Sequence, residues 1–178
     1  MGTVVGASDL DNSFAGSVVQ VCVVSRDLRR TMAGMVRLGI GPWQVHTFSP
    51  KTVDDMTYRG APATSIFKIA LAFSGTMMWE LIQPMEGPSI YGEFLEKHGE
   101  GVHHVAMDCA GADWDTRLQL FADHGYEVIQ SGRWLGKVPY AYFATEDDVT
   151  TTIETFIIPD DFPLPEPDEW YPAAPPAD

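Results

Sequence analysis

Four polar residues interrupt stretches of this sequence that are otherwise apolar. They are Gln20 in VVQVCVV, Glu80 in MMWELI, His104 in VHHVAM and Glu154 in TTIETFII. Burying a polar group without a partner costs about 1–3 kcal/mol, so their presence needs a reason. Two carboxylates, one imidazole and one amide form a hard-to-borderline ligand set. Such a set suits a divalent ion (Zn, Ni, Co, Mn or Mg) with positions left open for water.

The spacing of these residues suggests two copies of one unit. Gln20 and His104 lie on comparable apolar stretches about 84 residues apart, and each is followed by a glutamate on a later stretch. A single Glu or Gln in a strand most often points to solvent. If the first and last strands of each copy face one cleft, however, the four side chains converge. The pattern of all four together therefore favours a metal site.

The elements that must position these residues follow the same order twice. A β-branched run at 18–24 precedes a helical stripe at 26–38 that Gly39 ends, and the second copy repeats this order after an amphipathic segment at 88–98. The expected strands are 18–24, 43–48, 65–73 and 77–83, then 102–109, 126–131, 140–144 and 150–158, and the expected helices are 26–38 and 113–124. This order predicts an α+β fold in which tandem βαβββ modules form a curved mixed sheet around a metal-binding cleft.

Four segments follow from this interpretation. We expect a flexible N-terminal lead-in at 1–14, a first βαβββ module with a linker helix at 15–98 and a second module at 99–158. The remaining residues, 159–178, form an acidic tail in which seven residues are proline. Such a tail cannot form a helix and should run extended over the surface, anchored by Trp170 and Tyr171.

Charge and composition exclude several kinds of partner. The net charge is -14, and no cluster of Lys and Arg interrupts it, so nucleic acid and anionic membrane surfaces are poor partners. No secretory signal pattern and no apolar segment of about 18 residues is present, which predicts a cytoplasmic protein. Cys22 and Cys109 lie in apolar runs and are interpreted as reduced core thiols rather than as a disulfide or metal ligands. Strand alternation predicts that His103 faces away from His104 and is structural.

These motifs resemble the vicinal oxygen chelate superfamily, and in particular its glyoxalase I and methylmalonyl-CoA epimerase branch. The resemblance covers about residues 17 to 159 and rests on QVCVVSRDL, ELIQPM, EGVHHVAM and TIETFIIP. It implies that Gln20, Glu80, His104 and Glu154 hold the divalent metal. Gln at the first position is similar to eukaryotic-type glyoxalase I and argues against ring-cleaving dioxygenase chemistry.

The resemblance also implies a function. A carbonyl substrate would chelate the metal, which would stabilise an enolate or enediolate while Glu154 transfers the proton. The expected protein is thus a metal-dependent isomerase, epimerase or lyase. The alternative is a metal-free binding protein like the family's drug-sequestering members. Family members are often dimers, so a homodimer is also consistent with the resemblance.

One position departs from the epimerase pattern. The family places a second base, a Glu, on the third strand, where SIFKIALAF offers only Lys68. If Lys68 points into the cleft, it is a candidate catalytic base or a cation that holds the substrate. If it points outward, it is an ordinary solvated lysine. Tyr140 and Tyr142 share one strand face and could line an apolar pocket, which makes an aromatic substrate as plausible as a thioester.

Overall fold

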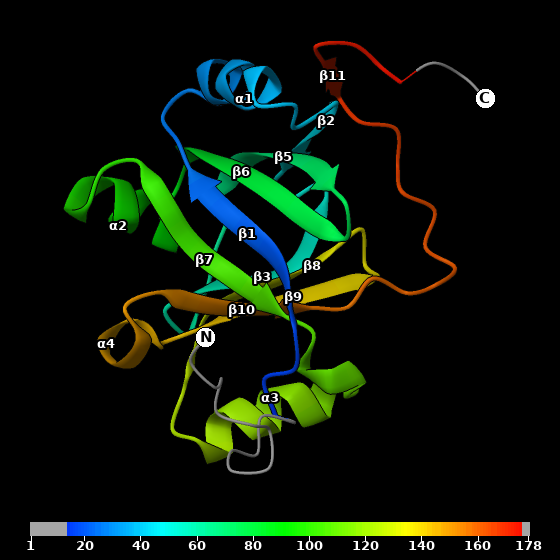
Figure 1. Ribbon diagram of the computed structural model, residues 1–178. Coiled ribbons are helices and arrows are strands. Elements are labelled where there is room, and N and C mark those ends of the chain that lie inside the picture. Colours follow the sequence, from blue (N-terminus) through cyan, green and yellow to red (C-terminus); the bar gives the residue numbers. More distant parts are fainter. Residues whose placement is uncertain (1–13, 176–178) are drawn as a thin grey trace, which may run out of the picture.

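The computed structural model describes residues 14–175, and its strands form one curved mixed sheet (Figure 1). The lead-in predicted for 1–14 therefore lies, except for Phe14, outside the described residues. The strands are β1 (Val18–Val24), β2 (Trp43–Phe48), β3 (Val53–Tyr58), β4 (Ala61–Pro62), β5 (Ile66–Ser74), β6 (Met77–Glu86), β7 (Gly101–Met107), β8 (Val128–Trp134), β9 (Val138–Phe143), β10 (Thr152–Phe156) and β11 (Glu169–Tyr171). The helices are α1 (Leu28–Arg37), α2 (Ile90–Lys97), the 3-10 turn η1 (Cys109–Gly111), α3 (Trp114–Asp123) and α4 (Glu146–Val149).

The strand order contains the predicted duplication. The sheet runs β11-β2-β5-β6-β1-β7-β10-β9-β8-β3-β4, so the series β2-β5-β6-β1 is followed by its reversed counterpart β7-β10-β9-β8. The two series meet where β1 pairs antiparallel with β7. Within each series the first strand pairs parallel with the last, β1 with β6 and β7 with β10. The predicted α+β fold with tandem βαβββ modules is confirmed.

Three strands were not predicted: β11 and β4 are the two edge strands of the sheet, and β3 lies next to β4. The hairpin of β3 and β4 leaves the first module and pairs with β8 of the second, while β11 in the tail pairs with β2 of the first. A segment of the first module therefore extends the sheet beyond β8 of the second module, and the tail that follows the second module extends the sheet beyond β2 of the first. The β3 sequence, VDDMTY, contains too many polar residues for a strand to be predicted from it. The partner that makes this segment a strand lies far away in the chain.

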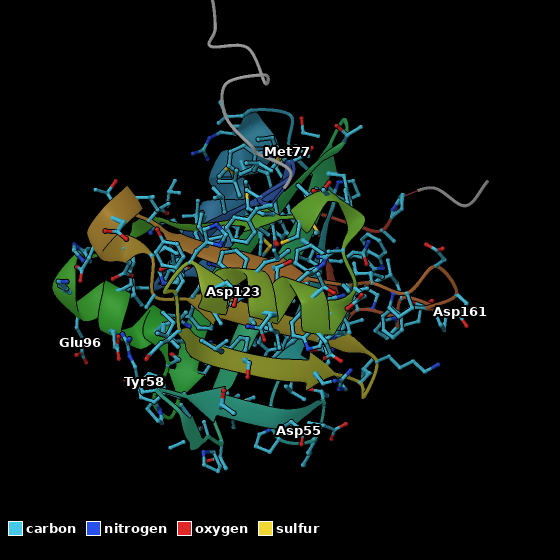
Figure 2. The ribbon with its side chains drawn as sticks, turned by 90° about the horizontal axis from the view of Figure 1, so that it is seen from below. Asp55, Tyr58, Met77, Glu96, Asp123 and Asp161 are labelled. Carbon is cyan, nitrogen blue, oxygen red and sulfur yellow. The ribbon has the colours of Figure 1, made fainter. Side chains whose placement is uncertain are left out.

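Helices cover the outer surface of the sheet at two places. Leu28 and Met32 of α1 pack against Trp43 and Leu81 on the first module, and Phe121 of α3 packs against the second. Asp27 is the N-cap of α1, and its side chain accepts a hydrogen bond from the backbone N–H of Arg30. Figure 2 shows α3, marked by Asp123, in front of the strands, and β3, marked by Asp55 and Tyr58, at the margin of the sheet.

A third group of buried side chains fills the concave inner side of the sheet. It contains Cys22 and Val24 of β1, and Tyr91 and Leu95 of α2. In Figure 1, α2 lies on one side of the curved sheet and the chain between β10 and β11 lies on the opposite side. Within residues 14–175, no helix is long and apolar enough to span a membrane.

Candidate metal centre and its cavity

The register of four central strands brings the four predicted ligands to one face of the sheet. Across β6, β1 and β7, Glu80 is level with Cys22, and Cys22 is level with His104. One step along the same face, Gln20 is level with Ala106, and Ala106 is level with Glu154 on β10. Residues two apart in a strand point to the same side, so both rows face the concave interior.

The predicted ligands converge on His104. Its Nε2 atom lies 3.2 Å from Glu80 Oε2 and 3.0 Å from Glu154 Oε2. His104 is completely buried, and Gln20, Glu80 and Glu154 are each at most 6% exposed. The structure therefore brings together side chains from both modules, although their positions in the chain span residues 20 to 154.

These side chains fit a divalent cation. Gln20 Oε1, Glu80 Oε2, His104 Nε2 and Glu154 Oε2 are all buried, and none of them forms a hydrogen bond to a residue outside this group. Buried polar atoms normally find partners, and a group of buried donor atoms that have no partners elsewhere is what a cation requires. Three oxygens and one imidazole nitrogen are donors that Zn, Ni, Co and Mn accept, and the oxygens also suit Mg.

Without a cation, a proton on His104 balances the negative charge of the Glu80 and Glu154 carboxylates. Burial lowers the pKa of His104, but the Glu154 and Glu80 carboxylates outweigh burial and raise that pKa to about 9. Burial also raises the pKa of Glu154. The protonated imidazole thus compensates two buried carboxylates, a role that a divalent ion would take over.

His103 does not face away from His104, so this prediction was wrong. A β-bulge interrupts the pairing of β1 with β7 between Cys22 and Val23, and it carries His103 into the interior beside Phe94 and Tyr91 of α2. Its Nδ1 atom lies 2.8 Å from His104 Nδ1. Burial and the neighbouring His104 hold the pKa of His103 well below its usual value. The Nδ1 atom of a neutral His103 can accept a hydrogen bond from His104 Nδ1–H, and that tautomer leaves the lone pair of His104 Nε2 free for a metal ion.

Two tyrosines lie beside Glu154. The Tyr91 hydroxyl donates a hydrogen bond to the Tyr142 hydroxyl at 2.9 Å. Tyr142 is level with Glu154 on the neighbouring strand β9. Both tyrosines therefore belong to the buried surroundings of this carboxylate.

An apolar cavity opens directly above the converging side chains. It encloses about 750 Å³, including the part open to solvent, and Gln20, Glu80 and Glu154 lie in its wall. Tyr140 and Tyr142 both line it, as the sequence suggested, and Leu164 from the tail covers part of it. None of the lining residues, all within the described part of the chain, is Lys, Arg or His. The aromatic part of the lining includes Phe48, Phe67, Tyr91, Trp134, Tyr140 and Tyr142.

Lys68 lies outside this cavity. On β5 the cavity is lined by Phe67, Ile69, Leu71 and Phe73, whose side chains alternate with that of Lys68. Lys68 is exposed on the opposite face, where it is level with Thr47 and Gln83. The outward-facing alternative for Lys68 is therefore the one observed, and the interpretation of Lys68 as a base in the cleft is corrected.

The interpretation of Cys22 as a reduced core thiol is confirmed, and the structure adds that this thiol lies next to the candidate ligands. It is fully buried between Glu80 and His104, and one ligand atom from each of these three residues lies within 4.8 Å of the other two. Burial, and then the nearby Glu80 carboxylate, raises the pKa of the Cys22 thiol. Its alternation with Gln20 along β1 was the signal in the sequence, because residues 20 and 22 must share a face.

Comparisons with known proteins agree with this geometry. Residues 19–142 match the family described as the Glyoxalase/Bleomycin resistance protein/Dioxygenase superfamily. Over 64 residues the chain is 36% identical to the uncharacterized protein YqjC of Bacillus subtilis (strain 168), a match that covers 35% of this chain and 44% of that protein.

Solved structures share the fold at low sequence identity. Methylmalonyl-CoA epimerase from Mycobacterium tuberculosis is 18% identical, with a TM-score of 0.59 over 83% of this chain and 91% of that one. A variant of Streptomyces coelicolor methylmalonyl-CoA epimerase in complex with 2-nitronate-propionyl-CoA is 20% identical, with a TM-score of 0.58 over 80% of this chain and 94% of that one. Together with the family match and the paired modules, these findings establish that the chain belongs to the glyoxalase/bleomycin resistance/dioxygenase superfamily, also called the vicinal oxygen chelate superfamily.

Proposed function

We propose that this protein is a metal-dependent isomerase or lyase that removes and returns a proton beside the carbonyl group of an apolar substrate. The observation that carries the proposal is the set of four buried donor atoms, with no hydrogen-bond partner outside their own group, beside an apolar cavity. A protein that only packed a hydrophobic ligand would have no use for two buried carboxylates and an imidazole at this place, because burying them is costly.

Each residue has a role in this proposal. Gln20, Glu80, His104 and Glu154 would hold the ion, which when bound would polarise the substrate carbonyl and stabilise the negative charge that develops beside it. Glu154 lies in the cavity wall beside Tyr142, so Glu154 is the group we assign to accept and return the proton. Tyr140 contributes its ring to the cavity wall, with its hydroxyl packed over Gly132.

The cavity favours chemistry that uses one base. Inverting a carbon centre by two bases requires a second acid or base on the far side of the substrate. Opposite the two carboxylates, the cavity wall within the described residues consists of apolar and aromatic side chains, with Gln44 as a polar exception, and Lys68 faces away. This distribution supports a lyase or an isomerase in which Glu154 acts alone over a two-base epimerase.

The same wall bears on the class of substrate. Thioesters of coenzyme A and glutathione conjugates are anionic and need cationic anchors. The cavity has no Lys or Arg among its described lining residues, and aromatic rings dominate it. We therefore propose a neutral carbonyl compound with an aromatic or polycyclic body, such as an aromatic hydroxyketone.

A proton-exchange experiment tests the proposal. The protein is loaded with Zn²⁺, Co²⁺ or Mn²⁺ and incubated in deuterated water with aromatic hydroxyketones, 2-oxo hemithioacetals or acyl-CoA thioesters. We expect metal-dependent deuterium uptake beside the carbonyl, observed by NMR, for the aromatic compounds. Glu154→Gln should abolish this uptake, whereas Lys68→Ala should leave it unchanged because that side chain is exposed on the other face.

The competing function is a metal-free binding protein, which the apolar and aromatic lining favours. A binding protein would retain its affinity for an aromatic ligand in the presence of a chelator and after Glu80→Ala or His104→Ala. It would catalyse no exchange with any metal. A chain that purifies without metal and cannot be loaded with one would exclude the enzymatic proposal and leave this alternative.

A further inference from the structure

Cys22 occupies the central position of the metal site. In the register of the sheet it is level with Glu80 on β6 and with His104 on β7, so it separates these two residues on the same face. One ligand atom from each of the three lies within 4.8 Å of the others, and Cys22 has no exposed surface. Adjacent ligands of one ion are about 2.8–3.8 Å apart for metal–ligand distances of about 2.0–2.3 Å, so side-chain rotations on binding would have to bring these atoms closer together.

Comparison of the two modules shows that Cys22 has no cysteine at the equivalent position of the second module. Superimposing Gln20 on His104 places Cys22 on Ala106, which faces the same interior from the second module. A small apolar residue therefore satisfies the packing at the equivalent position. Cys109 contacts Met107 and Thr155 at the outer surface of the sheet, beneath α3, and takes no part in the site.

We propose that the Cys22 sulfur is an additional ligand of the metal, on the side of the ion away from the cavity. The proposal rests on the metal site proposed above and extends it. When the ion binds, the S–H bond breaks, the proton leaves to solvent and a sulfur–metal bond forms, with no change of oxidation state. One ligand atom of Glu80 and one of His104 lie within 4.8 Å of this sulfur.

The position of Cys22 determines what the ligand would do. Gln20, Glu80 and Glu154 line the cavity, whereas Cys22 and His104 do not. With Cys22 as a fifth protein ligand, an octahedral ion would keep one position for a substrate oxygen. A soft thiolate among the donors selects Zn²⁺ and Co²⁺ over Mg²⁺ and Mn²⁺.

Cobalt spectroscopy tests the proposal independently of activity. The full-length protein is titrated with Co²⁺, whose visible absorption reports binding and whose near-ultraviolet sulfur-to-cobalt charge-transfer band reports a thiolate ligand. We expect the wild type and the control variant Cys109→Ala to show both signals. Cys22→Ser should retain visible cobalt absorption and lose the charge-transfer band. Circular dichroism of each variant establishes that it is folded.

The outcomes separate this proposal from the proposed function. Visible cobalt absorption without a charge-transfer band in the wild type would overturn the role of Cys22 and leave the metal site intact. The same conclusion follows if Cys22→Ser retains the band. No cobalt binding by folded wild-type protein would overturn the metal site and this proposal together. The test stays decisive if Cys22→Ser does not fold, because a charge-transfer band in Cys109→Ala can come only from Cys22, the one cysteine that variant retains.

Discussion

The two ring nitrogens of His104 have different tasks. Nε2 faces Glu80 and Glu154, and Nδ1 faces His103 at 2.8 Å. The partner of one nitrogen determines the protonation of the other, so His103 determines whether His104 presents a lone pair to a cation. Tyr142 is the corresponding neighbour of Glu154 and acts on the pKa of its carboxyl group. At the scale of single residues, the site therefore depends on neighbours that would not themselves bind the ion.

The substitution His103→Phe tests this dependence. Phenylalanine preserves the aromatic contacts with Tyr91 and Phe94 but removes the nitrogen that faces His104. We expect Zn²⁺ affinity to fall by about 10–100-fold, the usual effect of losing such a partner, while the fold is retained. Competition with a chromophoric chelator measures the affinity. His98→Ala, which changes an exposed histidine, is the control, and an unchanged affinity in His103→Phe would contradict the role.

Among the elements, the tail is the one that completes the cavity. β11 pairs with β2, Leu164 lines the cavity, and the Phe162 ring packs on Trp134 with their centroids 5.7 Å apart. An ion pair of Arg29 with Glu169 and the contact of Arg29 with the Tyr171 ring hold its end on α1. The tail thus covers the open side of the sheet, opposite α2 (Figure 1).

We predict that Phe162→Ala weakens ligand binding more than it weakens the fold. The substitution removes the contact with Trp134, which itself lines the cavity, but leaves the central strands intact. The dissociation constant of an aromatic ligand, measured by tryptophan fluorescence, should rise several-fold. Asp161→Ala is the matched control, because Asp161 lies on the same loop at the margin of the molecule (Figure 2). Equal effects of the two variants would refute a covering role for Phe162.

Glu100 connects the turn before β7 to the start of α1. Its carboxylate accepts hydrogen bonds from the Arg26 backbone N–H and the Ser25 hydroxyl and forms an ion pair with Arg30. The Arg30 guanidinium, followed by the Arg26 N–H, lowers the pKa of Glu100 from 4.5 to about 2. Because the folded state holds the carboxylate charged, this contribution to stability is complete above pH 4.5 and is lost as the pH falls toward about 2.

The substitution Glu100→Gln should therefore lower the urea midpoint of unfolding at neutral pH. Its difference from the wild type should shrink steadily as the pH falls below 4.5. The effect should be small, because solvent screens this exposed ion pair. Glu96→Gln, which removes an exposed charge from α2, controls for the change in net charge (Figure 2). A difference that grows in acid would show that the sign is wrong.

At the scale of the whole molecule, the proposed ion would join the two modules. Gln20 and Glu80 come from the first module and His104 and Glu154 from the second, and their strands are adjacent in the sheet. A ligand that binds the folded state alone stabilises it by RT ln(1 + [L]/Kd), where [L] is the free ligand concentration. The unfolded chain cannot assemble these four side chains, since they are far apart in the sequence.

We expect metal removal to destabilise the whole fold. At a free Zn²⁺ concentration of about 100 times the dissociation constant, the free energy of unfolding should rise by about 2.7 kcal/mol. The midpoint of thermal unfolding should rise accordingly, and a chelator should reverse the increase. Glu80→Gln should lose most of this response, whereas Lys68→Ala should retain it. Equal responses of these two variants would mean that Zn²⁺ stabilises the protein through another site.

The sequence by itself determined the repeated strands and the four predicted ligands. Side chains in a strand alternate with a period of two, so a polar residue in an apolar run is conspicuous wherever the strand lies. The equivalent places of Gln20 and His104, and of Glu80 and Glu154, in the two modules could therefore be predicted without a structure. The acidic, proline-rich tail was also predicted to be extended, since proline prevents a helix.

Only the tertiary structure decided which strands pair and which face each residue presents. A shift of one residue in register turns a side chain to the other face, and the sequence does not determine that register. This is why Lys68 could be placed on either face and why the bulge that turns His103 inward was missed. The pairing of β3 with β8 and of β11 with β2 joins segments far apart in the chain. The position of Cys22 between Glu80 and His104 likewise exists only once β6, β1 and β7 have paired, because local sequence carries no information about a neighbour in space.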